Sequence, residues 1–132
     1  MTLHVRSVAV KRLPESLDAK HGRLFFSELE ACMNVDRPLI VLDCSQVKQM
    51  DTSAIHFLLC CLEEAMKRNG DVKLTSISKG SKAILDLNGV GRLFEMFDTN
   101  AEAVASFRRA SVSAGGQTPA LSNRQHIAEN AA

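Results

Sequence analysis

The sequence predicts an α/β domain in which helices pack on a mostly parallel central sheet of four to five strands. Strand-like and helix-like segments alternate along the chain, and residues 39–42 form an unbroken apolar run. The helix-like segments are long enough to connect parallel strands, and such connections cross over in the right-handed sense. The 132 residues are about the length of one domain of this kind.

The first part of the chain predicts a strand, a helix and the central strand of the sheet. Residues 5–10 alternate as in a short strand, and Pro14 marks its exit. Ser16 can cap the following helix, in which apolar residues recur at helical spacing between residues 24 and 33. The apolar run at residues 39–42 is typical of a strand covered on both faces, which predicts a central position.

The second part of the chain repeats the alternation. We expect a helix over 53–68, a strand over 71–77, a short helix over 81–87, a strand over 94–97 and a final helix over 99–110. Asn69 and Gly70 form the stop signal of the first of these helices. The imperfect alternation of residues 71–77 indicates a position nearer the sheet edge.

The domain is expected to span residues 1–110, followed by a flexible tail over 111–132. The tail is rich in Ser, Gly, Ala and Asn and has few large apolar residues, so burial would not offset its chain entropy.

Composition excludes several classes of function. With 16 basic and 15 acidic residues, the net charge of +1 gives no electrostatic footprint for nucleic acid or for an anionic membrane. The first residues alternate polar and apolar side chains, unlike a signal peptide or a membrane span, so we expect a cytoplasmic protein without membrane insertion.

The four cysteines do not predict a metal site. Cys32, Cys44, Cys60 and Cys61 lack the paired spacing of zinc ligands and do not resemble a secreted disulfide framework. We interpret them mainly as small buried apolar residues, and we expect no metal and no cofactor.

The segment "KQMDTSAIHFLL", residues 48–59, carries the candidate site. Asp51 can cap the helix by accepting a hydrogen bond from the amide of Ser53 or Ala54. Thr52 and Ser53 then lie in the first turn, where unpaired amides and the helix dipole favour negative charge, so the fold would tolerate a phosphate there. The alternative is that the three residues are only a common helix start.

Three other parts of the sequence carry residues with possible chemical roles. His56 follows Thr52 by about one turn and could partly balance the charge of a phosphate there, or it could have no specific role. "NGVGR" lacks the third glycine of a dinucleotide loop, and Gly89 and Gly91 more simply allow a tight turn. A small hydrolase or nucleotide-binding enzyme using Cys44 or Asp51 is an alternative function, but no acid/base constellation supports it.

Two segments carry a resemblance to a known family: "RPLIVLDCSQVKQMDTSAIHFLLCCLEEAMKRNGDVKL" and "ILDLNGVGRLFEMFDTNAEAVASF". They resemble STAS domains, the family of bacterial anti-sigma-factor antagonists and of the cytoplasmic domains of sulfate transporters. The resemblance covers roughly residues 3–107. It implies a single STAS-like domain that acts as a non-enzymatic regulatory binding module.

In antagonists of this kind, a partner that is both anti-sigma factor and serine kinase phosphorylates the hydroxyl residue directly after the Asp. That residue is Thr52 here, with Ser53 as the neighbouring alternative, and ATP and magnesium would belong to the kinase. The predicted contact surface consists of Gln49, Met50, Asp51, Thr52, Ser53, Ile55 and His56. The alternative function is a STAS subunit of a transport system that binds a membrane-transport ATPase, and a homodimer is left open.

Overall fold

A computed structural model describes residues 7–112, with side chains described for residues 7–109. Its strands are β1 (Val8–Arg12), β2 (Leu39–Asp43), β3 (Asp71–Thr75) and β4 (Met96–Phe97). Its helices are α1 (Ala19–Met33), α2 (Thr52–Lys67), α3 (Lys79–Leu87) and α4 (Asn100–Val112), with a single 3-10 turn at Gly91–Leu93. The predicted tail lies outside the described residues, apart from residues 111 and 112, which end α4.

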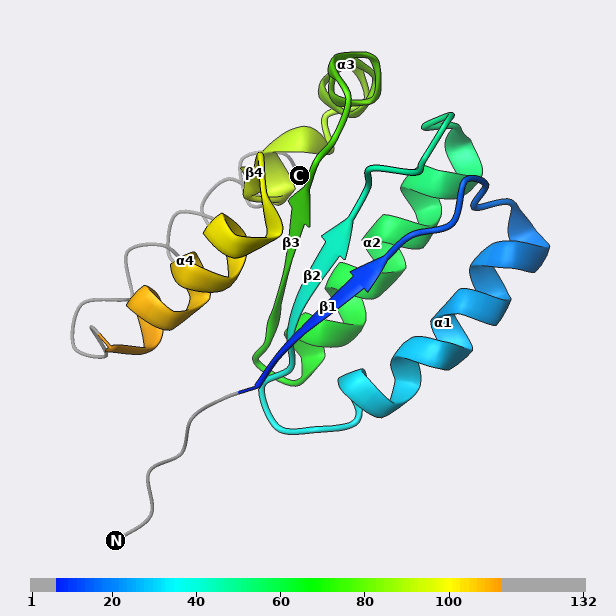
Figure 1. Ribbon diagram of the computed structural model, residues 1–132. Helices are drawn as coiled ribbons and strands as arrows, with labels where there is room; N and C mark the ends of the chain where they lie inside the picture. Colours follow the sequence, from blue (N-terminus) through cyan, green and yellow to red (C-terminus); the bar gives the residue numbers. More distant parts are fainter. Residues whose placement is uncertain (1–6, 113–132) are drawn as a thin grey trace, which may run out of the picture.

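The four described strands form one parallel sheet in the order β1-β2-β3-β4, so the predicted fold class is confirmed. Helices α1 and α2 lie side by side on one face, α4 covers the other face, and α3 lies beyond the carboxyl end of β3 (Figure 1). No helix within residues 7–112 is both long enough and apolar enough to span a bilayer.

The alternation of side chains along β2 divides the core between the two faces of the sheet. Ile40 and Leu42 belong to the large cluster beneath α1 and α2, whereas Leu39 and Val41 belong to a smaller cluster beneath α4. All five residues of β2 are buried, as the unbroken apolar run predicts for a central strand.

The predicted starts of several elements were wrong. The described strand β1 begins at Val8, and the predicted start at Val5 lies outside the described residues. The cap of α1 is Asp18, whose carboxylate accepts a hydrogen bond from the His21 amide at 2.8 Å, so Ser16 lies in the preceding loop. An ionised carboxylate is the stronger acceptor for unpaired helix amides, and Asp18 sits where the chain enters α1.

The later segments also differ from the prediction. Ser78 caps α3, so this helix begins at Lys79, two residues before the predicted start. β3 lies between β2 and β4, so it is one strand in from an edge, as β2 is, and not nearer the edge than β2 as predicted. Its polar residues at positions 73 and 75 face the side of the sheet that α4 covers, where other polar groups satisfy them. The alternation breaks at residues 76 and 77, which lie beyond the end of β3.

A glycine fixes the passage from α2 to β3. Asn69 adopts a φ of 62°, and the Gly70 amide donates to the Ala65 carbonyl at 2.8 Å. A β-carbon on Gly70 would lie 2.0 Å from the Pro38 carbonyl oxygen, a distance that requires the backbone to move. The predicted stop signal is therefore confirmed: Asn69 adopts the left-handed conformation of the turn, and Gly70 is required by the close approach of Pro38, which precedes β2.

Candidate functional site

The start of α2 presents two hydroxyl groups beside a formed helix cap. The Asp51 carboxylate accepts a hydrogen bond from the Ala54 amide at 2.9 Å, which confirms the predicted cap. Thr52 and Ser53 are the first two residues of α2, and both are exposed. The positive end of the helix dipole favours negative charge at this turn.

A groove of about 630 Å³ lies between α1 and α2 next to these hydroxyls. Thr52, Ser53, His56 and Cys60 line it from α2. Its apolar lining includes Leu17, Phe26 and Phe57, and its charged lining consists of Asp18, Arg23, Glu63 and Glu64. The site is therefore concave, with an apolar interior and more acidic than basic side chains.

Aromatic packing holds α1 and α2 together below this groove. The Phe57 ring from α2 makes edge contacts with the rings of Phe25 and Phe26 from α1, with centroid separations of 5.8 Å and 6.3 Å. Such edge-to-face pairs are favourable beyond the area they bury, so they help to fix the relative position of the two helices.

The structure brings most of the predicted contact residues to the surface. Gln49, Asp51, Thr52, Ser53 and His56 are exposed. Ile55 is half-buried and packs against the main core.

Met50 differs from the rest of the predicted contact surface. It is only 2% exposed and lies in the core. The prediction that Met50 forms part of the contact surface is therefore wrong: its apolar side chain packs in the core and fixes the loop before α2 to the domain.

His56 has a partner that the sequence reasoning did not identify. Its Nε2 lies 3.5 Å from the Sγ of Cys60, one turn further along α2. Thr52 and His56 line the same groove, and the expected support of a phosphate by His56 remains a prediction.

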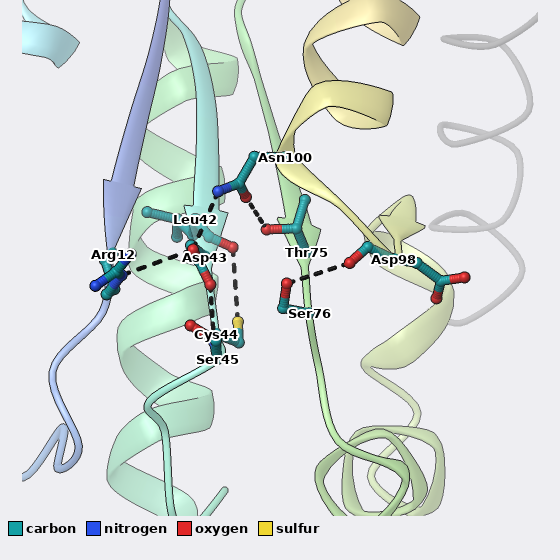
Figure 2. A network of polar contacts seen from close by, with 9 residues as sticks. All are labelled: Arg12, Leu42, Asp43, Cys44, Ser45, Thr75, Ser76, Asp98 and Asn100. Atoms are coloured by element: carbon teal, nitrogen blue, oxygen red, sulfur yellow. Dashed lines mark hydrogen bonds and ion pairs between the residues drawn. The ribbon is translucent and has the colours of Figure 1, made fainter.

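A second polar cluster occupies the carboxyl ends of β1, β2 and β3 (Figure 2). The Asp43 carboxylate accepts hydrogen bonds from the Ser45 amide at 2.9 Å and from the Asn100 side-chain amide at 3.1 Å. Arg12 Nε lies 3.8 Å from the same carboxylate, and the Thr75 hydroxyl donates to the Asn100 side-chain oxygen. This network joins the first residue of α4 to the sheet.

The charge of Asp43 is stabilised although the residue is only 5% exposed. Burial by itself raises the pKa of the carboxyl, but the hydrogen bonds from Ser45 and Asn100 and the nearby Arg12 outweigh it, so the pKa is lowered overall. Cys44 behaves differently, because burial and the Asp43 charge raise the pKa of its thiol to about 12. Cys44 is thus poorly suited to act as a nucleophile.

A buried lysine lies beneath α4. Lys73 is 4% exposed, donates to the Ser106 hydroxyl at 2.6 Å and pairs with Glu95 at 3.2 Å. Its ammonium lies 4.2 Å from the centre of the Phe107 ring, and burial lowers its pKa although the Glu95 charge opposes that shift. The amine therefore joins β3 both to α4, through Ser106 and Phe107, and to Glu95, which precedes β4.

The functional residues that sequence reasoning missed come from α1 and α4. Asp18, Arg23 and Phe26 reach the groove only because α1 packs beside α2, and no local pattern signals that pairing. The sequence does show Asn100 at a helix start and Asp43 at the end of a buried strand. The two residues are 57 positions apart, and no local pattern predicts that they are in contact. Within residues 7–109 no three His, Cys, Asp or Glu side chains are grouped so as to hold a metal ion.

Fold and site together define a small parallel α/β domain with a hydroxyl-bearing helix start at the edge of a groove. Residues 1–103 match the model of the STAS domain, so the chain belongs to the STAS domain family. A search of curated proteins finds no significant match.

Two solved structures of one Thermotoga maritima protein, TM1081, share the fold. The crystal structure, described as that of "a putative anti-sigma factor antagonist", has a TM-score of 0.66 and 22% identity, and covers 76% of this chain and 87% of that one. The NMR structure has a TM-score of 0.66 and 19% identity, and covers 83% and 95% of the two chains. The similarity extends over nearly the whole length of that protein and shows the common fold.

Proposed function

We propose that this chain is a non-enzymatic regulatory binding module of the anti-sigma-factor-antagonist kind, whose partner binding is controlled by phosphorylation of Thr52. The observation that carries the proposal is the position of Thr52: it is exposed, it is the first residue of α2, and it borders the groove between α1 and α2. The partner is a protein with kinase activity, and ATP and magnesium bind to that partner.

The structure around Thr52 supports a switch that does not unfold the domain. A phosphate adds about two negative charges and three acceptor oxygens, and the positive end of α2 stabilises them. Because the Thr52 side chain is exposed, the added group projects into solvent and leaves the core unchanged. The domain therefore stays folded in both states.

A phosphate on Thr52 would weaken binding where the partner covers the start of α2. Asp18, Glu63 and Glu64 outnumber Arg23 in the groove lining, but Glu64 pairs with Lys67 and Arg68, and Asp18 contacts His21. A partner that packs against the unmodified hydroxyl would have to bury the phosphate, which adds a desolvation cost and repels any acidic group that faces it. The unmodified protein is the binding form.

Recovery of the partner from the protein's own cells tests the proposal. The full chain is used as bait in four forms: wild type, Thr52→Glu, Thr52→Val and Ser53→Glu. We expect the wild type and Thr52→Val to retain the same ATPase and Thr52→Glu to lose it. Ser53→Glu tests the neighbouring alternative, because it places the same charge one residue further along the exposed first turn: loss of the ATPase by Ser53→Glu but not by Thr52→Glu would assign the switch to Ser53 instead.

Incubation with the recovered partner and ATP, followed by mass spectrometry, locates any phosphate. Modification at Thr52 that is absent from Thr52→Val supports the proposal. Equal retention of the partner by the wild type and Thr52→Glu contradicts the switch. Recovery of a membrane-transport ATPase that binds all four forms favours the alternative, a STAS subunit of a transport system that uses Thr52 as a fixed contact.

A further inference from the structure

A thiol and an imidazole meet on the α2 side of the groove. Cys60 Sγ and His56 Nε2 are 3.5 Å apart, within hydrogen-bonding distance for sulfur, and both residues line the groove. With its ring proton on Nδ1, His56 presents Nε2 as an acceptor for the proton of the Cys60 thiol. This arrangement of a base beside a nucleophile is the one that activates cysteine.

The other three cysteines lack one or more of these features. Cys44 and Cys61 are buried, and burial raises the pKa of both thiols. Cys32 is half-buried like Cys60, but it does not line the groove, and the described residues give it no histidine contact. Cys60 alone among the four therefore combines partial exposure, a base and open space beside the sulfur.

The groove provides that space. Its volume of about 630 Å³ is large enough for a small organic group attached to Cys60, and Phe26, Phe57 and Leu17 supply apolar contacts for it. Thr52 lines the same groove, so a group on Cys60 would share the surface that we assign to the partner.

We propose that Cys60 is a thiol-modification site that takes low-molecular-weight disulfides, with His56 as the base that activates it. The proton of the thiol moves to His56 Nε2, and the thiolate sulfur attacks one sulfur of the disulfide. A new S–S bond forms to Cys60 while the S–S bond of the reagent breaks. The second half of the reagent leaves as a thiolate, which takes up a proton to become a thiol, so the Cys60 sulfur is oxidised and the leaving sulfur is reduced.

This modification would give the groove a second means of control. A group bound to Cys60 occupies space between α1 and α2 that a partner would otherwise fill, and a cellular thiol removes it by the reverse exchange. That consequence rests on the proposed function, whereas the reaction at Cys60 does not.

The test uses the full chain and a neutral probe, 2-hydroxyethyl disulfide, so that no charge on the reagent biases the result. Rates of adduct formation at each cysteine are measured by mass spectrometry with peptide fragmentation, which distinguishes Cys60 from Cys61. We expect Cys60 to react first. His56→Gln should slow its reaction by about tenfold, below the range usual for a positioned base in an enzyme.

Two controls keep the result interpretable. Cys32→Ala should leave the rate at Cys60 unchanged, and circular dichroism should show that His56→Gln remains folded, since this side chain is exposed. Faster reaction at Cys32, or equal rates at Cys60 in the wild type and His56→Gln, overturns the proposal. Because the assay contains no partner and no kinase, it can fail while the proposed function stands.

Discussion

Replacement of Asp43 by alanine should weaken the attachment of α4 to the sheet. The change removes the acceptor of two hydrogen bonds, one from the Ser45 amide and one from the Asn100 side chain. A hydrogen bond to a charged group contributes about 1.5 to 3 kcal/mol, whereas the exposed Arg12 pair, at 3.8 Å, adds little. The Ser45 amide lies near the surface and can bind water instead, so its hydrogen bond is only partly lost. We therefore expect Asp43→Ala to lower the free energy of unfolding by about 2 to 4 kcal/mol.

The pH dependence of this loss can be stated from the pKa of Asp43. Burial raises that pKa, but the hydrogen bonds from Ser45 and Asn100 lower it by more than burial raises it. The pKa of Asp43 in the folded protein is therefore below its value in the unfolded chain. The stabilisation is then fully present above the unfolded pKa of about 4 and disappears as the pH falls through the lower, folded value. The difference between the wild type and Asp43→Ala should therefore be constant above about pH 5 and shrink in more acidic solution.

Urea unfolding followed by circular dichroism measures this difference at a series of pH values. Asp43→Asn is the matched control: it keeps the size and one acceptor oxygen but has no carboxyl to titrate, so its stability relative to Asp43→Ala should not change with pH. A destabilisation below about 0.5 kcal/mol for Asp43→Ala would refute the reasoning, because surface substitutions without a structural role have effects of that size. A destabilisation that stays constant as the solution becomes acidic would refute it as well.

Three further substitutions test the cap, the buried lysine and the tight turn. Asp51→Ala should lower the free energy of unfolding by about 0.5 to 2 kcal/mol and reduce partner binding, whereas Asp51→Asn should keep near-normal stability with reduced binding. Thermal melts and binding isotherms measure the two effects separately. Full binding by the folded fraction of Asp51→Ala would show that Asp51 is only a cap. In urea unfolding, the free energy of unfolding of Lys73→Met should be within about 1 kcal/mol of the wild-type value or higher, because the change removes a desolvated charge and keeps the packing against Phe107. A destabilisation as large as that of Lys73→Ala would contradict this expectation. Gly70→Ala should lower the free energy of unfolding by about 1 to 3 kcal/mol in the same assay, because the added β-carbon collides with Pro38. Gly80→Ala is the control: a β-carbon there meets no atom within 4 Å, so no destabilisation is expected.

The sequence predicts best those features that depend on neighbours along the chain. The apolar run of β2 and the cap of α2 are both encoded within a few residues, and the structure confirms both. The first helix was less well defined because Ser16 and Asp18 are both capping residues two positions apart, and the choice between them depends on where the chain leaves β1.

The features that the sequence did not predict join distant segments. The contact of Asn100 with Asp43 spans 57 residues, and that of Lys73 with Ser106 spans 33. Lys73 and Thr75 are the polar positions in the alternation of β3, a pattern typical of a face open to water, and no local pattern indicates that α4 covers them. The groove depends in the same way on the packing of α1 against α2, so only the half of the site that lies on α2 was predictable.

The unequal division of the core between the two faces of the sheet has a consequence for local unfolding. Within the described part of the chain, the cluster beneath α4 consists of Leu39, Val41, Ala103 and Phe107, whereas the cluster beneath α1 and α2 is several times larger. Helices held by fewer apolar contacts open at lower free energy, so α4 should form a separate cooperative unit in native-state hydrogen exchange. Detachment of α4 would leave the groove and the Thr52 turn assembled on the other face, so the surface that we propose as the binding site would persist after part of the domain had opened.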